Sequence, residues 1–288
     1  MEHVIGFPAL GLEFTMNRVA VQLFGKDIFW YGIIIAVGFL IAVMYCSRRV
    51  KDFGYTSDML YDALIWALPC AIICARIYYV AFEWDYYSQR PPIELIAVWK
   101  GGVAIYGGVI GALLAVTVFG RRRKLSIPGM FDVAALGLLI GQLIGRWGNF
   151  VNGEAHGTET TWLLGMTVDG AGPFHPTFLY ESLWNFIGFW ILHFISKKCY
   201  RFRGQIFLWY LVWYGAGRAW IEGLRTDSLY IGATGIRVSQ VVAAVSCIAG
   251  IILLVICHKR GVQTLTQLIN PHADARAVRT ETTKENEA

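Results

Sequence analysis

Hydrophobic residues follow one another in seven long runs, which short polar segments separate. Each run approaches the roughly 20 apolar residues that an α-helix needs to cross the hydrocarbon core of a bilayer. The runs cover residues 29–47, 61–81, 101–119, 130–147, 177–195, 205–222 and 238–257. This pattern predicts an all-α polytopic membrane protein with about seven transmembrane helices.

Basic residues cluster in every second gap between these runs. The clusters follow the first, third, fifth and seventh runs and contain Arg48, Arg49, Lys51, Arg121, Arg122, Arg123, Lys124, Lys197, Lys198, Arg201, Arg203, Lys259 and Arg260. Cytoplasmic loops of membrane proteins carry an excess of lysine and arginine. The alternation therefore predicts an odd number of spans, with the N-terminus outside and the C-terminus inside the cell.

The composition also favours a membrane protein over a water-soluble one. Of the 288 residues, 56% are hydrophobic and only 16% are charged, and the mean hydropathy is +0.50. Soluble domains carry about 25% charged residues. The deficit of charge indicates that much of the surface faces lipid.

Two polar segments flank the seven-helix membrane domain expected at residues 29–258. Residues 1–28 lack the pattern of a cleaved signal peptide. Within and just beyond them, LEFTMNRVAVQLFGKDIFW predicts one or two short strands on the outer surface, with a turn at Gly25-Lys26-Asp27. The main outer loop is expected at about 148–176, and the polar residues 259–288 predict a disordered cytoplasmic tail.

Ionisable side chains occur within the outer halves of the apolar runs. Arg76 lies in the second run, Arg146 at the end of the fourth, and Arg218 and Glu222 in the sixth. A charge near the bilayer centre costs at least about 2.5 kcal/mol, so such residues usually face a bundle interior or a wet cavity. Two interpretations stay open: structural ion pairs, such as Arg218 with Glu222, or a site for an anionic ligand.

The sixth run arranges its polar residues on one stripe of a helix. Tyr214, Arg218, Glu222 and Arg225 are spaced by four, four and three residues, so they share a face. Arginine is the planar, permanently charged donor that binds phosphate in a bidentate manner. A stripe of a phenol, two guanidiniums and a carboxylate therefore favours a ligand with an anionic head group.

The segment GRWGNFVNGEAHG, residues 145–157, adds polar groups at the outer end of the fourth run. Asn149 and Asn152 offer amide donors and acceptors that can orient Glu154 or a substrate hydroxyl. The glycines at the end of the segment let the chain leave the helix. The residues alone thus indicate a multispan protein that acts on an anionic phospholipid, or moves an anion, at the outer leaflet.

A phenol lies among glycines where the third run begins. In WKGGVAIYGGVIG, five glycines surround Tyr106. Glycine in membrane helices often marks helix–helix packing. That interpretation fits Gly107 and Gly111 but does not explain Tyr106.

Residues 145–157 resemble the signature of prolipoprotein diacylglyceryl transferases, G-R-x-G-N-F-x-N-x-E-x-x-G, at every fixed position. Further segments resemble the family in the family order, and the similarity extends from about residue 25 to 258. They are FWYG around Tyr31, ARIYYV at Arg76, GGVAIYGGVIG around Tyr106, HPTFLYE from His175 and YGAGRAWIEGLRTD from Tyr214.

The resemblance implies an integral enzyme of the bacterial inner membrane with seven spans and an outside N-terminus. Members transfer the diacylglyceryl group of phosphatidylglycerol to the lipobox cysteine thiol of a prolipoprotein. The reaction forms a thioether, releases glycerol phosphate and requires no metal or cofactor. The expected partners are phosphatidylglycerol, the prolipoprotein signal peptide and the lipid bilayer, with no nucleic acid.

The resemblance also implies roles for individual residues. Arg146 and Arg218 are expected to bind the lipid phosphate and stabilise the leaving group, and Tyr106 and Glu154 complete the expected catalytic set. Glu222 is expected to hold Arg218. The residues expected to contact substrate or shape its pocket are Tyr31, Arg76, Asn149, Asn152, Gly157, Tyr214 and Glu222.

One position departs from the commonest family pattern. Many members have a histidine, a proposed general base, where this chain has Tyr106. A phenol has a pKa of about 10, so only about one in a thousand is ionised near pH 7. We therefore expect Tyr106 to orient the substrate by hydrogen bonding, and Glu154, or water held by it, to accept the thiol proton.

The alternative function is a multispan carrier of an anionic solute. A carrier needs a polar path into the cytoplasmic half of the membrane. The inner halves of the apolar runs are almost uniformly apolar, which favours the enzyme.

Overall fold

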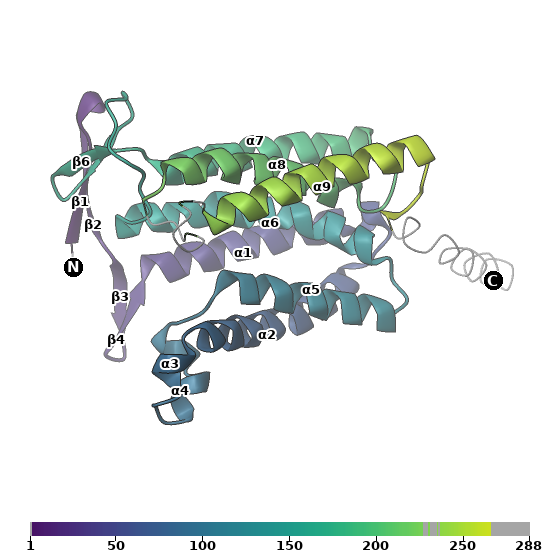
Figure 1. Ribbon diagram of the computed structural model, residues 1–288, viewed down its shortest axis with the longest axis horizontal. Coiled ribbons are helices and arrows are strands. Elements are labelled where there is room, and N and C mark those ends of the chain that lie inside the picture. The colour runs from purple at the N-terminus through teal and green to yellow at the C-terminus, as the bar shows by residue number, and fades with distance from the viewer. Residues whose placement is uncertain (1, 227–229, 231–234, 236, 266–288) are drawn as a thin grey trace, which may run out of the picture. The chain divides into compact units, whose positions relative to one another are not determined.

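The computed structural model describes residues 2–226, 230, 235 and 237–265, and it is mostly helical (Figure 1). The strands are β1 (Glu2–Phe7), β2 (Leu12–Asn17), β3 (Val19–Leu23), β4 (Lys26–Phe29), β5 (Met166–Val168) and β6 (Ala171–Phe174). The α-helices are α1 (Trp30–Arg49), α2 (Ser57–Phe82), α3 (Trp84–Tyr87), α4 (Ile93–Ile96), α5 (Ile105–Arg122), α6 (Ile127–Asn152), α7 (Thr177–Lys198), α8 (Gln205–Ile221) and α9 (Val238–Arg260).

Six of the described helices are long and apolar enough to cross a membrane. They are α1, α2, α5, α6, α7 and α9. Each of the seven predicted runs forms a helix, but the sixth run forms α8, which has only 17 residues. A helix of about that length lies at the lower limit for crossing a bilayer. The prediction of an all-α multi-pass membrane protein is confirmed, and the seventh span stays a prediction.

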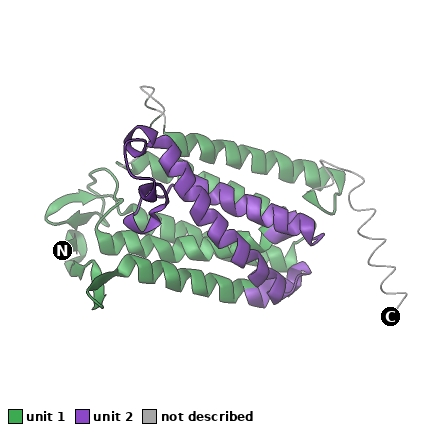
Figure 2. Cartoon of the chain, turned by 90° about the horizontal axis from the view of Figure 1, so that it is seen from below, with its two compact units in different colours: residues 1–46, 131–288 green, residues 47–130 purple. Residues whose placement is uncertain are grey.

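The chain forms two compact units, drawn in different colours in Figure 2. Unit 1 contains residues 1–46 and 131–288, and unit 2 contains residues 47–130. The boundaries fall inside α1 and α6, so the helices of the predicted membrane domain are divided between the units.

Unit 2 is built on the close packing of α2 and α5. Gly107 packs on the backbone of Cys74 and Ala75, and Gly111 packs on the carbonyl of Cys70. A side chain at either glycine would overlap this backbone. The packing role expected of the two glycines is therefore confirmed, and it follows the small-residue rule of membrane helices.

In unit 1, α7 and α8 interlock through two tryptophans. The rings of Trp184 and Trp213 stack with centroids 4.5 Å apart. Each indole Nε1 donates to the backbone carbonyl of the other tryptophan at 2.9 Å. Gly188 and Gly217 leave the space that these rings fill. The pairing satisfies both indole N–H groups inside an apolar bundle.

A buried aspartate joins α6 to the start of α8. Asp132 is fully buried. Its carboxylate accepts from the Tyr200 hydroxyl at 2.7 Å and from the backbone N–H groups of Gly204 at 2.6 Å and Phe207 at 2.8 Å. These amides belong to the first turn of α8, where backbone donors lack partners within the helix. Asp132 thus caps α8 from another helix.

The N-terminal strands form more structure than the sequence predicts. Antiparallel β1 and β2 pair from Glu2↔Asn17 to Phe7↔Leu12, and the sheet continues through β5 and β6. Strands β3 and β4 form a separate hairpin. Its two-residue turn is Phe24–Gly25, both at positive φ, as a type I′ turn requires. The predicted turn at residues 25–27 is therefore displaced, and Lys26 and Asp27 lie in β4.

The four-stranded sheet packs on the end of the helices of unit 1. Ile5 and Phe7 of β1 and Met166 of β5 form a core with Phe150 of α6 and Phe178 of α7. In Figure 1 the strands lie together at one end of α6 and α7. The sheet thus supports the ends of the two helices that carry Arg146 and Glu181.

The loop between α6 and α7 begins later than predicted. Helix α6 continues into the signature segment as far as Asn152, and Gly153 ends it at a φ of +62°. The expected exit of the chain at this glycine is confirmed, because a left-handed residue after the last turn is a common helix end.

The segment after α9 is packed up to Leu265. The Leu265 N–H donates to the Arg203 carbonyl, and the Arg203 N–H donates to the Gln263 carbonyl, each at 2.9 Å. Val262 and Leu265 pack on a cluster that contains Phe202. The rest of the predicted tail, residues 266–288, lies outside the described residues.

Candidate active site

Glu181 is the centre of a buried ion-pair cluster in unit 1. It lies on α7 and is only 4% exposed. Its Oε1 is 3.0 Å from Nη1 of Arg218 and 3.4 Å from Nη1 of Arg225, and its Oε2 pairs with Nη2 of Arg146. A carboxylate this deeply buried is stable only when it is paired. Three guanidiniums from α6, α8 and the segment after α8 provide this pairing.

A second carboxylate holds the end of α8. Glu222 Oε2 is 2.7 Å from Nη2 of Arg218, so the pairing expected from their i, i+4 spacing is present. The carbonyl of Glu222 accepts a hydrogen bond from Arg237, which also donates to the Arg225 carbonyl at 3.0 Å. Cations at the carboxyl end of a helix stabilise its terminal carbonyls.

Among the described residues, the cluster has more positive than negative groups. Arg146, Arg218 and Arg225 face two carboxylates, Glu181 and Glu222. The arginines are also the more accessible partners. The side chains of Arg146 and Arg218 are 21% and 18% exposed, against 5% for Glu181 and 3% for Glu222. An excess of accessible guanidinium groups favours the binding of an anion.

A chain of hydrogen bonds connects Arg146 to an exposed carboxylate. Arg146 Nη1 donates to Asn149 Oδ1 at 3.5 Å. The amide nitrogens of Asn149 and Asn152 donate to Glu154 Oε1 at 3.2 and 3.0 Å. The asparagines of the signature segment therefore orient Glu154, as the sequence predicts, and leave it exposed.

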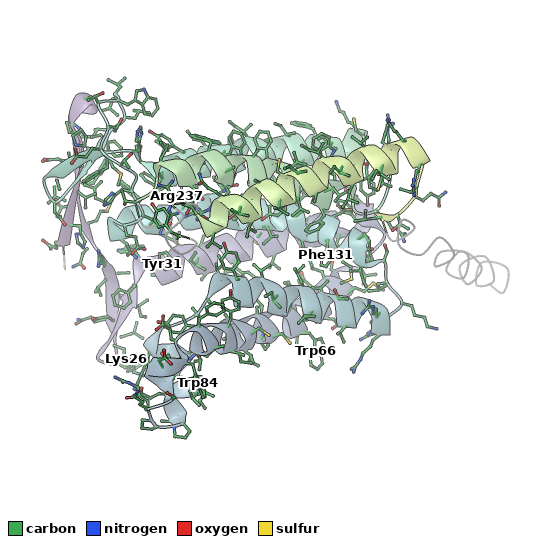
Figure 3. All side chains as sticks on the ribbon, in the orientation of Figure 1. Lys26, Tyr31, Trp66, Trp84, Phe131 and Arg237 are labelled. Atoms are coloured by element: carbon green, nitrogen blue, oxygen red, sulfur yellow. The ribbon has the colours of Figure 1, made fainter. Side chains whose placement is uncertain are left out.

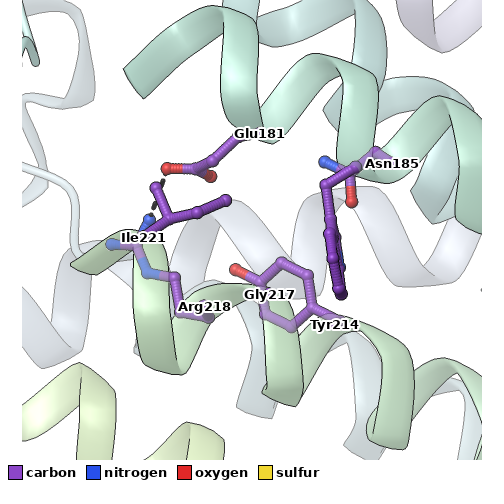
Figure 4. Close-up of a pocket in the computed structure, with 7 residues that line it drawn as sticks. Glu181, Asn185, Tyr214, Gly217, Arg218 and Ile221 are labelled. Carbon is purple, nitrogen blue, oxygen red and sulfur yellow. Dashed lines mark hydrogen bonds and ion pairs between the residues drawn. The ribbon is translucent and has the colours of Figure 1, made fainter. Parts of the chain in front are cut away.

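A pocket opens beside the cluster, between α7 and α8. It is lined by Glu181, Trp184, Asn185, Tyr214, Gly217, Arg218 and Ile221. Figure 4 shows the Tyr214 hydroxyl, the Arg218 guanidinium and the Glu181 carboxylate on the same side of this pocket. The polar stripe predicted for the sixth run therefore faces a pocket along part of its length.

Comparisons with known proteins identify the family of the chain. The family described as prolipoprotein diacylglyceryl transferase matches residues 18–256. The chain belongs to this family. Curated relatives named phosphatidylglycerol–prolipoprotein diacylglyceryl transferase include one from Limosilactobacillus reuteri (strain DSM 20016), 44% identical over 88% of this chain and 95% of the relative. Another from Finegoldia magna is 47% identical over 83% of this chain and 94% of the relative.

Two residues of the prolipoprotein diacylglyceryl transferase signature owe their identity to close packing. A Cβ atom on Gly148 would lie 2.6 Å from the ring of Tyr31, so this glycine allows α1 and α6 to approach. A Cβ on Gly157 would lie 2.7 Å from His175 Cβ and 2.9 Å from the Leu224 carbonyl. Roles for Tyr31 and Gly157 in substrate binding stay predictions.

Figure 3 shows where labelled side chains of unit 1 lie along the bundle. Tyr31 and Arg237 lie near the end that carries the strands, and Phe131 lies toward the other end. Tyr31 is 39% exposed. Tyr31 at the start of α1 and Arg237, which holds the end of α8, thus belong to one end of the unit.

The other predicted site residues, Arg76 and Tyr106, belong to unit 2. Arg76 is buried, and its guanidinium donates to the backbone carbonyls of Leu95, Gly101, Gly102 and Glu94 at 2.5–3.0 Å. Arg76 therefore stabilises the backbone of residues 94–102. A contact between Arg76 and lipid stays a prediction. Tyr106 is half-buried in the first turn of α5.

The sequence placed Arg225 in the polar stripe but assigned no individual role in the site to Arg225, Glu181 or Asn185. Glu181 and Asn185 lie in the fifth apolar run, and Arg225 lies just after the sixth. A carboxylate inside an apolar run is itself a signal of function. That signal was available for Glu181, whereas its partners depend on how α6, α7 and α8 pack.

Proposed function

We propose that this protein transfers the diacylglyceryl group of phosphatidylglycerol to the lipobox cysteine of prolipoproteins. The observation that carries the proposal is the excess of accessible arginine in the Glu181 cluster. It is supported by relatives that are named for this transfer. The reaction would be the first step of lipoprotein maturation.

The reaction replaces an oxygen with a sulfur on one carbon. The cysteine sulfur attacks the carbon of the diacylglyceryl group that bears the phosphate ester. A C–S bond forms as the C–O bond from this carbon to the phosphate breaks. The bonding electron pair leaves with the phosphate oxygen, and the thiol proton passes to a base. Negative charge therefore grows on the departing glycerol phosphate, and donors placed there accelerate the reaction.

Arg146 and Arg218 are the residues we assign to the lipid phosphate. Arg146 pairs with Glu181, and Arg218 pairs with Glu181 and Glu222, yet both side chains remain partly accessible. The carboxylates fix these side chains before the lipid binds, and preorganised charges stabilise a transition state without further rearrangement. Arg225 also pairs with Glu181 and adds a third positive charge to the cluster.

Glu154 is the residue we assign to the thiol proton, directly or through water. Its exposure leaves it accessible, and Asn149 and Asn152 hold its carboxylate in place. In this proposal Tyr106 donates a hydrogen bond to the substrate, and Tyr31 and Tyr214 contact the head group or the peptide. No step requires the ionised form of Tyr106.

We further propose that the enzyme lies in the bacterial inner membrane with the site toward the outer leaflet. Helices α1, α5, α7 and α9 all end in basic residues. The positive-inside rule assigns these ends to the cytoplasm. The opposite ends, which include the carboxyl end of α6 and the start of α7, would then face outward.

An anion carrier is the less favoured alternative, because the relatives are named as transferases. The test is to incubate the purified protein with phosphatidylglycerol and a lipobox peptide, and to weigh the peptide by mass spectrometry. We expect the mass gain of one diacylglyceryl group, and none with a peptide whose cysteine is replaced by serine. An unmodified cysteine peptide would contradict the proposal.

A further inference from the structure

The pocket beside the Glu181 cluster contains a buried polar atom that has no partner. Asn185 is only 2% exposed, and its Oδ1 accepts no hydrogen bond from any described residue. Buried side-chain oxygens are almost always hydrogen-bonded in folded proteins. This oxygen therefore needs a donor that the described chain does not supply.

Other buried polar side chains of α7 differ from Asn185 in this respect. The Thr177 hydroxyl donates to the Ala155 carbonyl. The Ser182 hydroxyl donates to the Leu143 carbonyl at 3.0 Å and accepts from Trp147 at 3.1 Å. The helix thus satisfies its polar groups wherever they face protein. Asn185 is the exception among these three, and it lines the pocket.

The position of Asn185 connects it to the phosphate-binding side chains. It lies one helical turn after Glu181, and both face the pocket that Tyr214 and Arg218 line from α8. Figure 4 shows Asn185 and Glu181 projecting from the same helix toward Tyr214 and Arg218. Trp184, whose ring stacks on Trp213, also lines this pocket. A ligand whose phosphate meets Arg218 could therefore place an adjacent polar group at Asn185.

The charge of the cluster restricts which donor can occupy this position. The described residues of the cluster place three arginines against two carboxylates, so a cationic donor such as an ammonium group would be repelled. A hydroxyl group is neutral and can donate as well as accept, so it satisfies either end of the carboxamide. The chemistry at Asn185 therefore fits an alcohol attached to a phosphate.

We infer that Asn185 binds a hydroxyl of the terminal glycerol of phosphatidylglycerol and so selects this head group. The inference rests on the proposed function and adds the residue that recognises the leaving group. Recognition works because a head group without the hydroxyl would leave the buried carboxamide unpaired. Sites built around a substrate hydroxyl reject analogues that lack it.

The test compares two lipids that differ only in these hydroxyl groups. Transfer to a lipobox peptide is measured from phosphatidylglycerol and from phosphatidylpropanol of the same acyl chains, in matched mixed micelles. We expect the wild-type protein to prefer phosphatidylglycerol by about 10-fold or more, the effect of one hydrogen bond of this kind. The Asn185→Leu variant should lower this preference to nearly equal rates.

A ratio of rates is insensitive to how much of each preparation is folded. Ser182→Ala is the matched control, because it alters a buried polar side chain of the same helix outside the pocket lining. It should keep the wild-type preference even if it melts at a lower temperature.

Two results would overturn the inference: a wild-type protein that uses both lipids equally, or an Asn185→Leu variant that keeps the full preference. An unmodified peptide with wild-type protein and phosphatidylglycerol would overturn the proposed function itself, and the inference with it. A preference that falls in Asn185→Leu but not in Ser182→Ala would establish the assignment.

Discussion

Arg76 in unit 2 and Arg218 in unit 1 are both arginines of helices in an apolar protein, yet they use their guanidinium groups differently. Arg76 donates to four backbone carbonyls of one segment. Arg218 pairs with two carboxylates, Glu181 on α7 and Glu222 at the end of α8. The first arginine fixes a loop, and the second belongs to a cluster of excess positive charge beside a pocket.

The difference shows how a buried charge can be assigned to structure or to function. A guanidinium has five N–H donors, and the Arg76 guanidinium donates four hydrogen bonds to carbonyls. Little capacity remains for a ligand. The Glu181 cluster instead keeps its arginines partly accessible and its charge unbalanced. The Arg76 site and the Glu181 cluster thus differ in whether their guanidinium groups can still bind an anion, and not only in how deeply they are buried.

The largest effect is expected when the centre of the cluster is neutralised. Glu181→Gln would leave three guanidiniums near one remaining carboxylate. Removing one partner of a buried ion pair costs about 3–5 kcal/mol of stability, so we expect a large fall in melting temperature and loss of transfer. Glu154→Gln is the matched control, because this exposed carboxylate should alter stability by about 0.5 kcal/mol or less. Equal melting temperatures for the two variants would argue against a buried cluster.

Replacement of Arg76 should affect stability more than chemistry. Arg76→Met leaves the carbonyls of residues 94, 95, 101 and 102 without their donors. An orphaned buried group costs about 1–3 kcal/mol, so we expect destabilisation by about 3 kcal/mol or more. The transfer rate per folded molecule should change little when rate and stability are measured on the same preparation. A selective loss of transfer at unchanged stability would instead support the predicted lipid contact.

Much of this contrast could not be derived from the sequence. The apolar runs predict the helices, and the spacing of Arg218 and Glu222 predicts their ion pair, because both depend on local geometry. The pairing of Glu181 with Arg146 joins residues 35 positions apart and depends on how two helices pack. The same holds for Asp132, whose carboxylate caps a helix that begins more than 70 residues later.

Substitution of Tyr106 tests whether a phenol acts as a hydrogen-bond donor or as a base. We expect Tyr106→Phe to lower the transfer rate by about 10-fold, the effect of one hydrogen bond, with an unchanged pH–rate profile. Tyr106→His should retain appreciable activity, because an imidazole can also donate. Loss of the basic rise in rate with pH in Tyr106→Phe would show that the phenolate is the base.

The smallest effect is expected at the surface of the segment that Arg76 holds. Hydrogen bonds from Lys100 and Arg90 hold the pKa of Glu94 below its usual value. A lowered carboxylate pKa stabilises the fold above the unfolded-state pKa, and this contribution is lost as the pH falls through the folded-state pKa. Glu94→Gln should therefore lower the melting temperature slightly at pH 7 and have no effect at acidic pH. An effect that persists at low pH would contradict this origin.

The most direct test of the account is to measure transfer rate and melting temperature together for Arg146→Lys and Arg218→Lys. Lysine keeps the positive charge that Glu181 and Glu222 require, but it lacks the planar fork that binds phosphate. We expect each variant to lose about 10- to 100-fold in rate, the worth of a charge-assisted hydrogen bond, while its melting temperature stays near the wild-type value. Wild-type rates in both variants, or a loss that only follows unfolding, would contradict a phosphate-binding role for the cluster.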